Sequence, residues 1–176
     1  GTVIDLQVMP NGDLLAAGSF TTAGGSPANR IARWDGASWS ALGSGFDSSV
    51  SCLSLLPNGD VLAGGSFSTA GGTPASRVAR WNGSSWSPVS LTISRQGQAG
   101  TGSVLAMTAL PNGDYMIGGA FYMLGGAVAR HLARLTTTCP ATATSYGAGC
   151  TGSAGPLTLA VSNLPWLGNT YRATAT

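Results

Sequence analysis

The sequence predicts an all-β protein with three tandem four-stranded antiparallel blades of the propeller type, the last incomplete, followed by a short β-rich tail. One motif occurs three times, as PNGDLLAAGSF from Pro10, PNGDVLAGGSF from Pro57 and PNGDYMIGGAF from Pro111. Successive copies begin 47 and then 54 residues apart, and a period of about 40 to 50 residues is typical of four-stranded propeller blades. The chain also lacks Lys and Glu and contains 27 Gly, a composition that disfavours helices and favours β-structure.

Each repeat presents its strands in the same order. An apolar run comes first, written VIDLQVM, VSCLSLL or VLAMTAL. Pro-Asn-Gly-Asp then predicts a tight hairpin turn of type I′, which requires positive φ angles. The second strand ends in small residues and leads into a Gly-rich loop, TTAGGSPANR or STAGGTPASR. IARW, VARW and HLAR predict the third strand, and the Asp35-Gly36 and Asn82-Gly83 turns lead into the fourth.

The repeats are assigned to residues 1–137, in units of about 1–47, 48–101 and 102–137. An insertion around LTISRQGQAGTG explains the longer second interval, and Leu135 replaces the Trp of the third strand with no fourth strand after it. Three blades are too few for a ring, because propellers generally have four to eight. We expect further blades of the same parent chain, or copies of this chain, to complete it. Since Gly1 stands in an expected strand, the chain is expected to be a piece of a longer one.

Small and aromatic residues recur at fixed places in the repeats. The Gly64-Gly65 and Gly118-Gly119 pairs are expected to let neighbouring backbones approach closely, with Ala17-Gly18 at the same place in the first unit. Five aromatic side chains are expected to fill the wedges between blades: Phe20, Phe67, Phe121, Trp34 and Trp81.

The stretch GGSFxTAGGxPAxRxARWxGxSWS resembles Rax2-like, delta-60-type repeats, and the order of strands is similar to kelch-type blades. The resemblance covers roughly residues 1–135 and implies a secreted or surface-attached protein of bacterial type. Residues 138–176 resemble a Cys-bounded linker and the start of a C-terminal β module in such proteins.

Two of the three cysteines lie outside the repeats. Cys139 and Cys150 bracket the short loop CPATATSYGAGC, where a disulfide is favoured over two free thiols and implies an oxidising compartment. Cys52 lies in an apolar strand and is expected to be a small buried residue.

The sequence offers little that is suited to catalysis, which needs a tunable group beside a partner. The one His, His131, occupies the place that Arg30 and Arg77 hold in the other repeats, and Glu is absent. Asp13, Asp60 and Asp114 recur at one turn position and Asp35 stands at another turn, leaving only Asp5 and Asp47 as a non-equivalent carboxylate pair. We expect no enzyme activity, no cofactor and no metal, with calcium at the Asn-Gly-Asp turns left open.

A net charge of +2 and evenly spread Arg argue against nucleic-acid binding, and no apolar run approaches the roughly 20 residues of a membrane helix. Recurring Arg33, Arg80 and Arg134 are expected to pair with the turn Asp residues or to bond loop carbonyls. An Arg-rich face for acidic glycans is the alternative. The candidate binding residues are Arg30, Arg77, His131, Trp39 and Trp86. The predicted function is a non-catalytic extracellular structural or protein-interaction module, and the alternative is a lectin-like, carbohydrate-binding propeller.

Overall fold

A computed structural model describes residues 1–89, 93–95, 98–99, 101–111, 114–124, 127–129 and 131–135. The prediction of an all-β fold built from propeller-type antiparallel sheets is confirmed for these residues. The predicted tail of residues 138–176 and the predicted Cys139–Cys150 disulfide lie outside them. No helix in the described part of the chain is long and apolar enough to cross a membrane.

Three antiparallel sheets follow one another along the chain, and we call them the first, second and third blades. The first has the order β1-β2-β5-β6 and comprises β1 (Val3–Val8), β2 (Leu14–Gly18), β5 (Ile31–Trp34) and β6 (Trp39–Ala41). The second comprises β7 (Val50–Leu55), β8 (Val61–Gly65), β11 (Val78–Trp81) and β12 (Trp86–Pro88). The third, within the described residues, comprises β15 (Ser103–Ala109), β16 (Tyr115–Ala120) and β19 (Leu132–Leu135).

The stretches expected to be Gly-rich loops are short β-hairpins. They comprise β3 (Thr22–Ala23) with β4 (Ser26–Pro27), and β9 (Thr69–Ala70) with β10 (Thr73–Pro74). In the third blade the hairpin of β17 (Met123–Leu124) and β18 (Ala127–Val128) is extended by β13 (Ile93–Arg95) and β14 (Gln98–Ala99). Residues of the predicted insertion therefore pair with the hairpin of the blade that follows it.

The first two Pro-Asn-Gly-Asp turns are not of the predicted type I′, and Asn112 and Gly113 of the third lie outside the described residues. Gly12 and Gly59 take positive φ, but Asn11 and Asn58 do not. In the first repeat Gly12 N donates to Met9 O at 3.0 Å, and Met9 N donates to Asp13 O at 2.8 Å. This is the three-residue hairpin loop in which a type I turn is followed by one left-handed Gly. Pro favours it, because its fixed φ suits the first central position of a type I turn.

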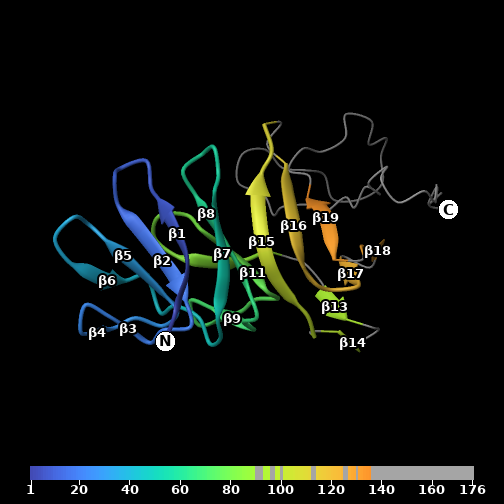
Figure 1. Ribbon diagram of the computed structural model, residues 1–176, viewed down its shortest axis with the longest axis horizontal. Coiled ribbons are helices and arrows are strands. Elements are labelled where there is room, and N and C mark those ends of the chain that lie inside the picture. Colours follow the sequence, from blue (N-terminus) through green and yellow to red (C-terminus); the bar gives the residue numbers. More distant parts are fainter. Residues whose placement is uncertain are drawn as a thin grey trace.

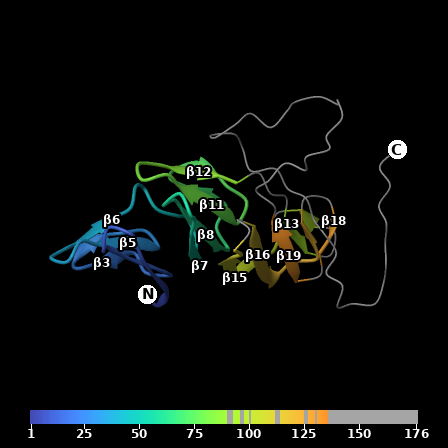
Figure 2. The ribbon, with the colours of Figure 1, turned by 90° about the horizontal axis from the view of Figure 1, so that it is seen from above.

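The blades stand side by side (Figure 1), and in the view from above they fan outward (Figure 2). Their first strands β1, β7 and β15 are neighbours. Residues that pair directly across strands share a face of the sheet. In the second blade Leu53, Ala63 and Ala79 define what we call the front face, which packs against the first blade. Cys52, Gly64 and Val78 define the back face, which packs against the third blade.

The apolar core consequently lies between blades. One cluster joins Leu15 and Ile31 of the first blade to Val50 and Leu53 of the second. Another joins Leu62 and Val78 of the second blade to buried front-face residues of the third, namely Val104, Ile117 and Ala133. Sheets packed through small and branched residues in this way form the stacked blades of a propeller.

The paired glycines have two different neighbours. A Cβ on Gly64 would lie 2.6 Å from Val104 Cγ1, on the next blade. A Cβ on Gly65 would lie 2.2 Å from Ser49 O, at the end of its own blade's first strand, where a β-bulge separates Val50 from Cys52. Gly119 meets Ser103 O in the same way. Gly118 differs from the expectation of close approach, because the nearest atom to its Cβ position is 3.8 Å away.

Candidate functional site

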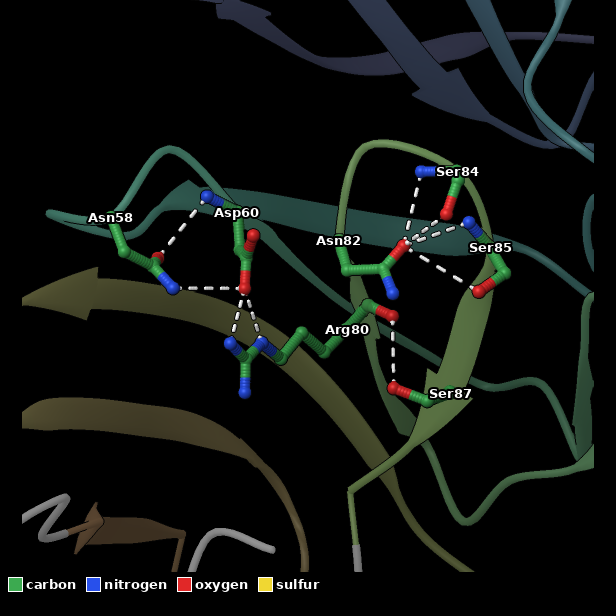
Figure 3. A network of polar contacts seen from close by, with 7 residues as sticks. All are labelled: Asn58, Asp60, Arg80, Asn82, Ser84, Ser85 and Ser87. Carbon is green, nitrogen blue, oxygen red and sulfur yellow. Dashed lines mark hydrogen bonds and ion pairs between the residues drawn. The ribbon is translucent and has the colours of Figure 1, made fainter. Parts of the chain in front are cut away.

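The recurring Asp and Arg residues form an ion pair in each repeat, and Figure 3 shows that of the second blade. Arg80 Nε lies 2.5 Å from Asp60 Oδ2, and Arg80 Nη2 contacts the same oxygen. Asn58 Nδ2 donates to that oxygen at 3.0 Å, while Asn58 Oδ1 accepts from Asp60 N at 3.2 Å. The Asn-Gly-Asp turn is thus closed by its own side chains and tied to the third strand of the sheet.

The Asp–Arg pair recurs in the other two repeats, and in the first repeat the Asn contact recurs with it. Arg33 Nε lies 2.5 Å from Asp13 Oδ2, and Asn11 Nδ2 donates to the same oxygen at 2.6 Å. Arg134 Nε donates to Asp114 Oδ2 at 2.8 Å. The three carboxylates are mostly buried, whereas the three guanidinium groups are partly exposed. Between the two structural roles left open by the sequence, pairing with the turn Asp is the one found for these three Arg.

Arg30, Arg77 and His131 share an unusual backbone conformation. Their φ angles are 67°, 66° and 71°, and in the described residues no other non-glycine residue has positive φ. Each backbone N–H donates to the carbonyl of the Phe that follows the second strand of its blade, as Arg30 N does to Phe20 O at 2.8 Å. Each residue therefore forms a corner at the start of the third strand of its blade. The left-handed conformation costs about 1–2 kcal/mol for a residue with a Cβ.

The side chains at these corners have different environments. Arg77 Nε donates to Gly102 O at 2.7 Å, and its Nη1 donates to the carbonyls of Ser66 and Phe67. This guanidinium bonds carbonyls of the second blade and of the segment entering the third. His131 Nδ1 lies 3.1 Å from Gly119 O, within its own blade. The two side chains thus contact backbone of the fold itself.

A shallow pocket of about 200 Å³ lies beside Arg77. Its lining residues are Ser68, Pro74, Ala75, Ser76, Arg77 and Ile93. Among the described lining residues Arg77 alone is charged, and its Nε and Nη1 atoms bond carbonyls.

The two candidate Trp residues occupy equivalent places but differ in burial. Trp86 is 6% exposed, its Nε1 donates to Leu42 O at 3.0 Å, and its ring packs against Phe46 at 4.7 Å. Trp39 pairs with Trp34 at 5.5 Å between ring centroids, and both are half-buried. The Trp34–Trp39 pair of the first blade is the more accessible aromatic surface.

Asp5 and Asp47, the two carboxylates without equivalents in the other repeats, each accept hydrogen bonds from backbone N–H groups, in different parts of the fold. Asp5 Oδ2 accepts from Leu53 N at 2.6 Å and so joins the first blade to the second. Asp47 accepts from the backbone N–H groups of Ser68 and Thr69, both at 2.9 Å, and from the Ser68 hydroxyl. Partial burial raises the pKa of Asp47, but these hydrogen bonds outweigh it and the net pKa is lowered. Each carboxylate stabilises a junction or a hairpin, not a shared reaction centre.

Cys52 is a free, buried cysteine on the back face of the second blade. Burial, with a smaller contribution from the negative charge of Asp5, raises the pKa of the Cys52 thiol to about 12. Such a thiol is a poor nucleophile, because the thiolate is the reactive form. Across the described ranges, His, Cys, Asp and Glu side chains form no group of three or more that is placed to hold a metal ion.

Two important residues escaped the sequence reasoning. Phe46 lies in the Gly- and Ser-rich connection between the first two blades, packs on Phe67 with ring centroids 4.5 Å apart, and is buried. Leu42, in the same connection, supplies the carbonyl that Trp86 bonds. Their one signal in the sequence is a lone Phe and a lone Leu in a connection otherwise of small and polar residues.

Stacked four-stranded sheets with a shared repeat define a β-propeller repeat protein. Residues 10–34 and 56–84 match the family model described as "Domain of unknown function (DUF5122) beta-propeller". Residues 10–34 run from the Asn-Gly-Asp turn of the first blade to the end of its third strand. Residues 56–84 run from the equivalent turn of the second blade to the turn that follows its third strand. Neither the curated proteins nor the solved structures yielded a match to this chain.

Proposed function

We propose that this chain is a non-catalytic, extracellular β-propeller segment that acts as a structural or protein-interaction module. The observation that carries the proposal is that the recurring polar residues form ion pairs and hydrogen bonds with other parts of the fold. The Asp and Arg of each repeat pair with one another, and Asp5, Asp47 and Arg77 bond backbone groups. A module built in this way offers its partners surfaces and loops.

Support for an extracellular location comes from the resemblance to Rax2-like and kelch-type repeats of secreted proteins. The predicted Cys139–Cys150 disulfide has the same implication, because disulfides persist in oxidising compartments. The proposed partners are further blades of the same parent chain or copies of this chain, and nucleic acid is not among them.

Carbohydrate binding is the second candidate, and the half-buried Trp34–Trp39 pair is the observation that favours it. Aromatic rings that remain accessible provide flat apolar surfaces with a polar edge. In this alternative, Arg30, which precedes the third strand of the same blade, would supply a positive charge.

A glycan array followed by calorimetric titration tests the two candidates. The proposed module gives no saturable oligosaccharide binding, with either the wild-type chain or Trp39→Ala. Saturable binding that disappears in a correctly folded Trp39→Ala chain would replace the proposal with the lectin-like function. Trp86→Ala is unsuitable here, because Trp86 is buried and its loss would disturb the fold.

A further inference from the structure

The turn between β11 and β12 contains an Asn-Gly sequence that is held differently from those of the Asn-Gly-Asp turns. Asn82 Oδ1 accepts hydrogen bonds from Ser84 N at 3.0 Å, from Ser85 N at 2.9 Å and from the Ser84 hydroxyl at 3.0 Å (Figure 3). Asn82 Nδ2 and Gly83 N donate no hydrogen bond within the part of the chain that the structure describes. All four residues of the turn are exposed. The side-chain amide of Asn82 is therefore fixed through its oxygen alone.

An Asn side chain that precedes Gly can react with its own backbone. The glycine nitrogen attacks Cγ of the asparagine and loses its proton, a Cγ–N bond forms, and the Cγ–Nδ2 bond breaks to release ammonia and leave a succinimide ring. Water then opens the ring, which gives aspartate when Cγ is attacked and isoaspartate when the main-chain carbonyl is attacked. The net change exchanges the amide NH2 for OH without oxidation or reduction. Glycine hinders the ring closure least, because it has no Cβ beside the attacking nitrogen.

The turn favours this reaction at Asn82. As Gly83 N attacks Cγ, negative charge develops on Oδ1, which already accepts two backbone N–H groups and a hydroxyl. Donors placed in advance at a developing oxyanion stabilise the transition state. Within the described chain, neither the attacking nitrogen nor the leaving nitrogen has a hydrogen bond that must first break.

The Asn-Gly-Asp turn of the second blade holds the same groups in place. Gly59 N donates to Leu56 O at 2.9 Å, and Asn58 Nδ2 donates to the Asp60 carboxylate at 3.0 Å. Among the described residues, Asn58 Oδ1 accepts one N–H, that of Asp60, at 3.2 Å. The turn of the first repeat has the same three hydrogen bonds. Ring closure in these turns must break the bonds of both nitrogens and has fewer donors to stabilise the oxyanion.

The first blade shows that the turn accommodates the product of the reaction. Asp35 is equivalent to Asn82, and its Oδ1 accepts from Ala37 N at 2.9 Å and from Ser38 N at 2.8 Å. Asp35 N donates to Ser38 O at 3.3 Å, as Asn82 N does to Ser85 O. The hydrogen bonds from the backbone, first that of Ser38, lower the pKa of Asp35. A carboxylate at position 82 would be stabilised by the same donors.

We propose that Asn82 is a site of spontaneous deamidation, and that the fold directs the reaction to this residue in preference to Asn11 and Asn58. The modification places a negative charge on the β11–β12 hairpin of the second blade. In the isoaspartate product it also lengthens the backbone of the turn by one methylene group. This inference goes beyond the proposed interaction function and does not depend on it.

The test incubates the folded full chain at mildly alkaline pH in heavy-oxygen water and follows oxygen incorporation at each Asn by peptide mapping and mass spectrometry. Deamidation at Asn82 should be at least about tenfold faster than at Asn11 and Asn58, because of the hydrogen bonds that those two sites must break. In guanidinium chloride, where the turns are lost, the three sites should react at similar rates. Asn82→Gln should remove the product at position 82. An Asn82 that stays intact in the folded chain overturns the inference, and so does equally fast reaction at Asn58.

A matched pair of variants tests the donors to the oxyanion. Ser84→Ala removes a hydroxyl that lies 3.0 Å from Asn82 Oδ1, whereas Ser85→Ala removes one that lies 3.5 Å away. Both side chains are exposed, so both variants should keep the wild-type circular dichroism spectrum. Ser84→Ala should slow deamidation about two- to tenfold, and Ser85→Ala should leave the rate unchanged. Equal rates in the two variants would overturn the activating role of the turn.

Discussion

The indole N–H of Trp86 donates to the backbone carbonyl of Leu42, 44 residues earlier, at 3.0 Å. This hydrogen bond ties the fourth strand of the second blade to the connection that leaves the first. Trp39, the equivalent residue one repeat before, has no such hydrogen bond among the described residues and is half-buried. The same side chain at the same place in the repeat therefore has different consequences for stability.

Trp86→Phe removes the donor and leaves the Leu42 carbonyl without a partner in a buried place. We expect the free energy of unfolding to fall by about 1–3 kcal/mol. Trp39→Phe is the matched control and should change it by less than about 0.5 kcal/mol. Urea unfolding measures both. Equal losses would show that the bond to Leu42 has no special role.

Asp114→Asn is expected to destabilise the protein more than Asp13→Asn. The Asp114 side chain is almost completely buried, whereas Asp13 and its partner Arg33 are more exposed. A charge-assisted hydrogen bond contributes about 1.5–3 kcal/mol when shielded from water and less when exposed. Thermal unfolding of the two variants at one pH ranks them, and the reverse order would contradict the role of burial.

Arg30→Gly and Arg77→Gly separate backbone strain from side-chain bonding. Glycine adopts positive φ readily, so Arg30→Gly is expected to leave stability unchanged or raise it by up to about 1 kcal/mol. Arg77→Gly relieves the same strain but loses the hydrogen bonds to Gly102, Ser66 and Phe67. Its free energy of unfolding should therefore fall by about 1–2 kcal/mol, net of the relief. Denaturant titration checks both, and similar changes in the two variants would refute the carbonyl-binding role.

Gly64→Ala tests the tight junction between the second and third blades. The added Cβ would lie 2.6 Å from Val104 Cγ1 and 2.7 Å from Cys52 Sγ, so the blades must move apart. Overpacking of this kind costs about 1–3 kcal/mol. Gly118→Ala, at the equivalent but open position, should cost little in the monomer. The midpoints of thermal unfolding, measured with dilute protein, provide the comparison.

Cys52 makes stability depend on alkaline pH. Its folded pKa of about 12 exceeds the ordinary value of 9.0, so the unfolded chain ionises first as the pH rises. The contribution of the neutral thiol is complete below pH 9 and is lost progressively toward pH 12, at about 1.4 kcal/mol per pH unit. In Cys52→Ala the free energy of unfolding should fall less steeply with pH. The part of the fall that comes from ionisation of the Tyr residues should remain. Parallel slopes for the two chains above pH 9 would show that the thiol is not shielded.

The repeat allowed the blades to be predicted, because a spacing of 47 residues with turn signals at fixed offsets leaves few alternatives to four-stranded sheets. Asp13, Asp60 and Asp114 could be assigned to turns for the same reason. The prediction of a type I′ turn was wrong, because it rested on Asn-Gly alone. The Pro that precedes Asn-Gly favours a type I turn. Hairpins with two-residue strands leave almost no periodic pattern, so the sequence predicts loops in the Gly-rich segments.

The candidate site was less predictable, because the repeat hides how unlike its equivalent residues are. Trp39 and Trp86 have the same sequence context, yet their burial depends on Phe46, a residue outside the motif. Arg30 and Arg77 likewise share a backbone conformation but not their hydrogen bonds. Such differences come from contacts between repeats, which no single repeat encodes.

The location of the core between sheets determines how this protein gains stability as it grows. A lone sheet of this kind has no enclosed apolar interior, so each added sheet contributes chiefly through the contact it makes with its neighbour. An open array has one contact fewer than it has sheets, and closure supplies the missing one. Amide hydrogen exchange should accordingly be slowest in β7 and β8, which are flanked on both sides, and faster in β2 and β16 toward the ends of the array.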